Sequence, residues 1–226
     1  MCGRYTLAGK PVDLEKHLRV RLLADSYTAS YNIAPGQTIL CCFDSDPQIL
    51  RTAQWGMVPY WAKSSEKPLT LINVRDDSLL QKKGFAPYRK SGHCLIAATG
   101  FYEWKTIANK KQPYYFHCLN EPFIFFAGIY EMYDHSLNKV AIITTRASAC
   151  VAPIHDRMPV ILNPKDAFNW LEGSNDYADL LQPYPAEEME AFPVSTHVNR
   201  AVDNNPNLIE PISLQNKTTP NLFDSL

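Results

Sequence analysis

The sequence predicts an α+β fold in which a mainly antiparallel, barrel-like β-sheet carries peripheral helices. Short runs rich in β-branched and aromatic residues recur along the chain, and turn-forming residues separate several of them. No regular helix alternates with these runs, which favours antiparallel strands over a parallel α/β sheet. We expect strands at residues 39–43, 48–54, 93–98, 101–105, 114–119, 123–128 and 140–144.

Helices are expected around this sheet. The clearest begins at Pro11 and extends to residue 23, because Leu14, Leu18 and Leu22 recur every four residues. We expect one or two short helices within residues 78–90, further helices at 164–171 and 175–181, and an irregular, Asn- and Pro-rich segment at 201–226. No linker or internal repeat divides the chain, so residues 1–226 are expected to form a single domain.

The composition is that of a globular protein, with 46% apolar residues among 226. The longest apolar stretch, around residues 122–130, is far shorter than the roughly 20 residues that span a bilayer. No segment of signal-peptide type precedes it. We therefore expect an intracellular, cytoplasmic protein with no membrane partner.

The charge is unevenly distributed. The net charge of −1 argues against a protein that coats nucleic acid over its whole surface, yet residues 75–111 carry eight basic and three acidic residues. Residues 163–226 carry three basic and ten acidic residues. This asymmetry fits a local anion-binding groove, and it fits a solvated basic face without a partner equally well.

Cys2 differs from the other five cysteines of the chain. Those five lie mostly in strand-like apolar runs without a Cys-x-x-Cys pair, so we expect small buried side chains and neither a metal site nor disulfides. Cys2 follows the initiator methionine directly. The other cysteines lie at positions 41, 42, 94, 118 and 150.

Removal of Met1 by an aminopeptidase would leave Cys2 with a free thiol and a free α-amine. Such a 1,2-aminothiol condenses with an aldehyde to an imine, and the thiol then closes a five-membered thiazolidine. An α-amine titrates at roughly 7.7–8.0, so part of it is neutral at cellular pH. Ring closure is intramolecular and loses little further entropy. The alternative is that Cys2 is an ordinary second residue.

Two further residues have the chemistry of proton carriers. Glu103 lies between Tyr102 and Trp104, so we expect partial desolvation and a raised pKa. The alternative places Glu103 on a solvent face, where it pairs with a neighbour. His155 lies in a polar string and can move a proton near neutrality, although a lone histidine is more often a structural hydrogen-bonding group.

Cationic and aromatic residues suggest contacts with nucleic acid. Arg75 and Arg157 can each bind a phosphate through two hydrogen bonds, or they can bridge carboxylates within the fold. Tyr60 and Trp61, next to Pro59, can stack on bases or pack in the core.

Six motifs occur together in a fixed order. They are Cys-Gly-Arg-Tyr from residue 2, Tyr-Asn-x-Ala-Pro from 31, Trp-Gly-x-x-Pro-x-Trp from 55, Asn-x-Arg from 73, Gly-Phe-Tyr-Glu-Trp from 100 and Ile-His-x-Arg-Met-Pro from 154. In this order they resemble the SOS-response-associated-peptidase (SRAP) family of abasic-site processing proteins. The resemblance implies a sensor that captures abasic sites in single-stranded DNA through a covalent link to the mature N-terminal cysteine. It requires no metal and no organic cofactor.

The resemblance also implies roles for individual residues. Cys2 would be the nucleophile, Asn73 would orient the amine or the opened sugar, and Glu103 and His155 would move protons at the floor of a basic cleft. The residues expected to contact DNA are Arg4, Asn32, Pro35, Trp61, Arg75, Thr144 and Arg157.

One position departs from the family pattern. Some members carry two tryptophans after the proline of the third motif, whereas this chain has Tyr60-Trp61, which leaves one tryptophan for stacking. Two other functions are compatible with the sequence. One is a cysteine peptidase that uses Cys2 with His155 and either Asn73 or Glu103. The other is a non-catalytic module that binds single-stranded DNA.

Overall fold

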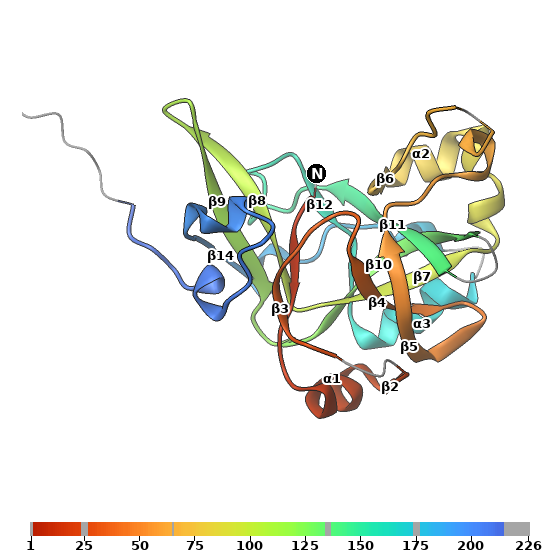
Figure 1. Cartoon of the computed structure of the whole chain (residues 1–226), viewed down its shortest axis with the longest axis horizontal. Helices are drawn as coiled ribbons and strands as arrows, with labels where there is room; N and C mark the ends of the chain where they lie inside the picture. The colour runs from red at the N-terminus through yellow and green to blue at the C-terminus, as the bar shows by residue number, and fades with distance from the viewer. Residues whose placement is uncertain (1, 24–26, 65, 134–136, 174–176, 215–226) are drawn as a thin grey trace, which may run out of the picture.

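A closed barrel of five strands forms the centre of the molecule (Figure 1). The computed structural model describes residues 2–23, 27–64, 66–133, 137–173 and 177–214. Neighbouring barrel strands pair antiparallel, and a parallel contact between β5 and β11 closes the ring. In spatial order the strands are β11 (Leu137–Arg146), β10 (Ile124–Tyr133), β7 (His93–Ala98), β4 (Thr38–Phe43) and β5 (Asp46–Trp55).

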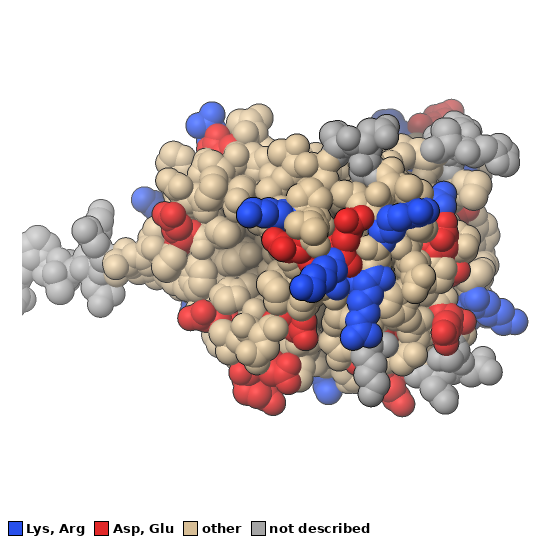
Figure 2. Space-filling model, turned by 90° about the horizontal axis from the view of Figure 1, so that it is seen from below, with Lys and Arg blue, Asp and Glu red and all other residues tan. Residues whose placement is uncertain are grey.

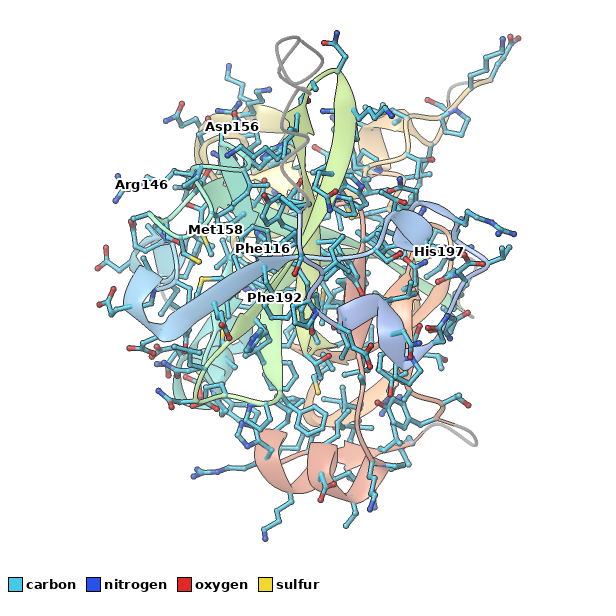
Figure 3. All side chains as sticks on the ribbon, turned by 90° about the vertical axis from the view of Figure 1, so that its left-hand side faces the viewer. Phe116, Arg146, Asp156, Met158, Phe192 and His197 are labelled. Carbon is cyan, nitrogen blue, oxygen red and sulfur yellow. The ribbon has the colours of Figure 1, made fainter. Side chains whose placement is uncertain are left out.

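A second, five-stranded sheet lies beside the barrel. Its order is β14 (Met189–Pro193), β9 (Lys110–Cys118), β8 (Gly100–Ile107), β1 (Tyr5–Leu7) and β3 (Ser30–Ile33). Figure 3 looks onto this sheet from the β14 side, with Phe116 of β9 and Phe192 of β14 labelled. The turn between β8 and β9 has positive φ at Ala108 and Asn109, the geometry of a tight two-residue hairpin.

Four short strands complete the pairing, and two of them flank β11 near the functional site. Strand β6 (Asn73–Arg75) pairs parallel with β11, and β12 (Arg157–Pro159) pairs antiparallel with it. Strand β2 (Arg21–Leu22) pairs with β5, and β13 (Ile161–Leu162) pairs with β10. The sequence analysis missed these strands because runs of two or three residues carry no readable alternation.

Helix α3 (Pro164–Glu172) covers the outside of β7 and β10. The indole N–H of its buried Trp170 is shared between the backbone oxygens of Cys94 and Gly128, at 3.1 and 3.3 Å. A Cβ atom on Gly128 would come within 2.5 Å of the Ile96 side chain, so this position has no room for one. Strand β7 is therefore buried on both faces, which explains its almost continuous apolar sequence.

The first helix is shorter than predicted. Helix α1 (Pro11–Leu18) ends because Arg19 adopts a left-handed backbone conformation with φ of 55°, and the chain then enters β2. The predicted extension to residue 23 is wrong, since Leu22 belongs to a strand that lies against β5.

The remaining helical segments are short. Helix α2 (Asp76–Gln81) and the 3₁₀ turns Lys83–Phe85 and Pro87–Arg89 match the short helices predicted within 78–90. Part of the helix predicted at 175–181 lies outside the described residues, and Tyr177–Leu180 forms a 3₁₀ turn instead. Further 3₁₀ turns lie at Tyr60–Ala62, Ala186–Glu188, Thr196–Asn199 and Pro206–Ile209, the last of them within the segment predicted to be irregular.

The α+β class with a mainly antiparallel, barrel-like sheet is confirmed. Cys41, Cys42, Cys94 and Cys118 are buried, as expected, and Cys150 is partly buried. Within the described part of the chain, no helix has the length and apolar character needed to cross a membrane.

Candidate active site

Strand β1 brings the start of the chain beside β8. The Tyr102 N–H donates to the carbonyl oxygen of Arg4 at 3.0 Å, so the residues before Arg4 run alongside Glu103. Cys2 is fully buried there, and its thiol donates to the Arg4 carbonyl oxygen at 3.6 Å. The thiol thus lies beneath the surface of the resting protein.

This burial determines the protonation of Cys2. Desolvation raises the pKa of the Cys2 thiol well above its usual range, and the negative charge of Glu103 raises it further. The thiol is therefore protonated at neutral pH. A protonated thiol can deliver its own proton when it adds to an imine, whereas a thiolate nucleophile requires a lowered pKa.

Glu103 is almost completely buried, with 3% of its surface exposed. Alternation along β8 turns Tyr102 away, and the Tyr102 hydroxyl donates to the Tyr31 carbonyl oxygen at 2.7 Å. Burial raises the pKa of Glu103, while the positive charges of the amino terminus and of His155 oppose that rise. The predicted desolvation of Glu103 is confirmed, and the alternative of a solvent-exposed residue is wrong.

His155 lies next to Glu103. Its Nε2 is 3.9 Å from Oε2 of Glu103, and its Nδ1 accepts a hydrogen bond from the Arg157 N–H at 3.0 Å. When Nδ1 accepts this bond, the ring proton lies on Nε2, which faces the carboxyl group. The exposed carboxylate of Asp156 lies 3.0 Å from Nδ1 and can pair with the ring when it is protonated.

Asn73 contacts Cys2 directly. Its Nδ2 donates to the carbonyl oxygen of Cys2 at 2.8 Å. Its Oδ1 is buried and has no hydrogen-bond partner among the residues described. A buried acceptor without a partner is costly, so Oδ1 is suited to receive a donor from an amine or a sugar hydroxyl at Cys2.

Arg4 and Asn32 form hydrogen bonds with the backbone of residues 198–203. Arg4 Nη1 donates to Oδ1 of Asn32 at 2.8 Å and to the carbonyl oxygen of Val198 at 2.9 Å. Asn32 Nδ2 donates to the carbonyl oxygens of Arg200 and Asp203, at 2.9 and 2.8 Å. These bonds tie β1 and β3 to the segment that follows β14, and the role of both residues in DNA contact stays a prediction.

Arg75 and Arg157 are both paired with acids. Arg75 is exposed and forms a two-point ion pair with Asp77, whose pKa its hydrogen bond lowers. Arg157 is largely buried, and its Nη2 donates to Asp76 Oδ1 at 2.7 Å and to the Thr144 carbonyl oxygen. Arg157 Nε is buried without a partner among the described residues, which leaves one donor directed at no protein acceptor. Contact of these residues with DNA stays a prediction.

Asp76 is a residue that the sequence analysis missed. Besides Arg157, it accepts a hydrogen bond from the Thr145 hydroxyl at 2.7 Å and one from the Asp77 N–H at 2.8 Å. It thereby positions Arg157, whose N–H orients His155. Its signal in the sequence is an acidic residue directly after the Asn-x-Arg motif, next to a second acid that is easily mistaken for its equivalent.

Two pockets are lined by residues of the candidate site. One, of about 550 Å³, is lined by Glu103, Trp104, Lys111, His155 and Asn199. The other, of about 440 Å³, is mostly apolar, and its lining includes Asn73, Arg75, Lys82, Phe85 and the partly exposed Trp61. The structure thus groups Cys2, Asn73, Glu103 and His155, with Arg157 and Thr144 behind them. Pro35 is exposed in the turn between β3 and β4, and its predicted role stays open.

A larger pocket, of about 980 Å³, lies elsewhere and contains none of these residues. It lies at the α1 end of the molecule, between Lys16, Arg19, Glu121 and Glu188. Figure 2 shows the face seen from below, on which Lys and Arg side chains are interleaved with Asp and Glu. Among the described residues, no three His, Cys, Asp or Glu side chains gather as a metal site requires.

Comparison with known proteins shows the family of this chain. The family model for SOS response associated peptidase (SRAP) matches residues 1–201, and the chain belongs to this family. It is 38% identical over 222 residues to the abasic site processing protein YoqW of Bacillus subtilis, with 93% of this chain and 99% of that protein covered. It is 31% identical to the abasic site processing protein YedK of Escherichia coli, with 94% of this chain and 100% of YedK covered.

A eukaryotic relative and solved structures extend the comparison. The abasic site processing protein HMCES of Xenopus tropicalis is 28% identical and covers 100% of this chain with 82% of its own length. A crystal structure of a Bacteroides thetaiotaomicron protein superposes with a TM-score of 0.81 at 22% identity, covering 94% of this chain and 100% of that one. This last likeness shows a shared fold.

Proposed function

We propose that this protein captures abasic sites in single-stranded DNA as a covalent thiazolidine formed by Cys2 after Met1 has been removed. Relatives that share most of its length are named abasic site processing proteins. The observation that carries the proposal is the grouping at Cys2 of Asn73, 2.8 Å from its carbonyl oxygen, with the Glu103–His155 pair. The DNA would be encountered inside the cell, and no cofactor enters the chemistry.

The reaction begins with the opened, aldehyde form of the abasic deoxyribose. The neutral α-amine of Cys2 adds to the aldehyde carbon to give a carbinolamine, which loses water to form an imine. The Cys2 sulfur then bonds to the imine carbon, and the thiol proton passes to the nitrogen. One water molecule is released in total, and no oxidant or reductant is needed.

The protonation states at the site suit this order of steps. Burial raises the pKa of Glu103 and so favours its protonated form, which can donate the proton that the carbinolamine hydroxyl needs to leave as water. His155, 3.9 Å away, can return that proton to Glu103. The buried, protonated thiol of Cys2 reacts after the amine, once the imine carbon lies beside it.

The surroundings favour a single strand with an extruded sugar. Trp61, 40% exposed at the rim of the apolar pocket, can stack on a neighbouring base. The buried Arg157 Nε and the Asn73 Oδ1 supply an unused donor and an unused acceptor at the lesion. Since the aldehyde itself identifies the lesion, no base needs to be read.

The test compares two cysteine substitutions. Wild-type protein and Cys94→Ala should both form a denaturant-resistant adduct with an abasic oligonucleotide, and Cys2→Ala should form none. Cys94 is a suitable control because it is fully buried in β7. An adduct that persists in Cys2→Ala would refute Cys2 as the nucleophile.

The cysteine peptidase alternative has less support. A peptidase needs a thiolate close to its base, whereas burial raises the pKa of the Cys2 thiol and that thiol donates to a backbone oxygen. Aldehyde capture by an amine requires no thiolate, so a protonated thiol is compatible with it.

A further inference from the structure

The hairpin formed by β8 and β9 extends from the active site into solvent. Glu103 lies at its base, and the turn at Ala108 and Asn109 lies six residues further on, a distance of about 20 Å at roughly 3.3 Å per residue. In Figure 1 the hairpin projects from the side of the molecule where the chain begins, and in Figure 3 it extends past the labelled Asp156. The hairpin is therefore within reach of a strand bound at Cys2.

Three lysines give this hairpin an unbalanced positive charge. Lys110 and Lys111 are exposed and Lys105 is partly exposed, while the sequence has no acidic residue between Glu103 and Glu121. Among the described residues, none of the three lysines forms an ion pair or a side-chain hydrogen bond. Their charges are available to a ligand.

The arginines nearer the lesion differ in this respect. The guanidinium groups of Arg75 and Arg157 are paired with the carboxylates of Asp77 and Asp76, and that of Arg4 is bound to the C-terminal segment. These paired groups would each have to exchange a protein acceptor for a phosphate, whereas Nε of Arg157 has no partner among the described residues. A paired arginine that exchanges its carboxylate or carbonyl acceptor for a phosphate gains less binding free energy than an unpaired lysine that binds a phosphate. The paired arginine groups are therefore poor sources of salt-dependent affinity.

The hairpin register places Lys105 and Lys110 on the same face as Glu103, whereas Lys111, paired with Thr106, lies on the opposite face. Lys105 follows Glu103 by two residues and shares its face of the strand, and Lys110, paired with Ile107, lies on that face nearer the turn. Lys111 lines the pocket that also contains Glu103 and His155. The positive charge thus begins at the pocket and continues along the hairpin.

We propose that Lys105, Lys110 and Lys111 bind successive phosphates of the single strand as it leaves the abasic site, and that they supply much of its salt-dependent affinity. This inference rests on the proposed function for its ligand, single-stranded DNA. The hairpin acts as a non-specific arm, because contacts to phosphates carry no base information.

The test measures binding against salt for a single-stranded oligonucleotide that contains a tetrahydrofuran abasic analogue, which has no aldehyde and cannot crosslink. Each phosphate contact contributes about 0.7 to the slope of log K against log salt, so Lys105→Gln/Lys110→Gln/Lys111→Gln should lower the slope by about 2. Between 50 and 200 mM NaCl the wild-type affinity should then fall roughly 20-fold more than that of the variant.

The control removes three exposed cations from the far end of the molecule, as Lys10→Gln/Lys16→Gln/Arg21→Gln in and around α1 and β2. Its slope should equal that of the wild type. A hairpin variant with an unchanged slope would overturn the inference, and these lysines would then belong to the solvated surface. A separate assay tests the proposed function, by measuring the covalent adduct that wild-type protein forms with a natural abasic strand. Absence of that adduct would refute the capture chemistry while leaving a change in salt slope intact.

Discussion

The Asp76 carboxylate should determine both the stability and the reactivity of the site. Substitution by alanine removes the acceptor of the Thr145 hydroxyl, in a residue that is 1% exposed, and an unsatisfied buried hydroxyl costs about 1–3 kcal/mol. It also removes the ion-pair partner of Arg157. Breaking a fully buried pair costs roughly 3–5 kcal/mol. The Arg157 and Asp76 side chains are 12% and 20% exposed, and Arg157 keeps the Thr144 carbonyl oxygen as an acceptor. Loss of their ion pair should therefore cost less, about 1–2 kcal/mol.

The Asp76→Ala variant should therefore lose about 3 kcal/mol of unfolding free energy in urea denaturation. It should also capture abasic DNA more slowly at a temperature where it remains folded, because the Arg157 side chain loses its ion-pair partner in the residue whose backbone N–H binds the His155 ring. Asp77→Ala is the matched control. Asp77 is the adjacent residue and pairs with Arg75, but those two side chains are 43% and 55% exposed, and water and salt screen exposed pairs. Equal effects of the two substitutions on stability and rate would refute the reasoning.

The remaining predictions concern the strand that carries Glu103 and the aromatic rim. Glu103→Gln should slow adduct formation about 100-fold or more, measured by single-turnover kinetics, because it removes a proton donor. The same variant should become more stable relative to wild type as pH rises. Burial raises the pKa of Glu103 in the folded state, so the protonated carboxyl group stabilises the wild type fully below its unfolded-state pKa. That stabilisation is lost as pH rises through the folded-state pKa, and the glutamine variant has no such loss. A constant difference in unfolding free energy between the two proteins from pH 4 to 8 would contradict this. Gly100→Ala should lower the melting temperature, since its Cβ would lie 2.4 Å from the Tyr115 hydroxyl and 2.5 Å from the Phe116 carbonyl oxygen; an unchanged melting temperature would show that β9 can move aside. Trp61→Ala should weaken binding of the tetrahydrofuran strand by about 1–3 kcal/mol, and unaltered binding would exclude stacking there.

The barrel could be predicted from the sequence because its strands are long and apolar. The run at 93–98 matches β7 residue for residue, since burial on both faces leaves almost no polar residue in the strand. The helix from Pro11 was extended too far because Leu22 continues its four-residue spacing, although Leu22 packs as part of β2. Periodicity alone does not reveal a left-handed residue such as Arg19 that ends the helix.

The candidate site was predicted as a set of residues without its internal contacts. The burial of Glu103 was predicted correctly, although alternation along β8 turns its aromatic neighbours to the opposite face, so their side chains do not themselves surround the carboxyl group. The contacts of Arg4 and Asn32 with the segment after β14 could not be foreseen, since they join residues that are more than 160 positions apart. Asp76 was missed for the same reason: its partners lie on β11 and β12.

Intact-mass analysis of the products tests most directly whether the Cys2 amine and thiol act together. Purified protein is reacted with an abasic oligonucleotide alongside a form that carries one additional residue before Cys2. We predict that only protein lacking Met1 gains the mass of the oligonucleotide less one water, and that the extended form remains unmodified. An adduct of the same mass on the extended form would contradict thiazolidine formation, because its α-amine lies on a different residue from the thiol.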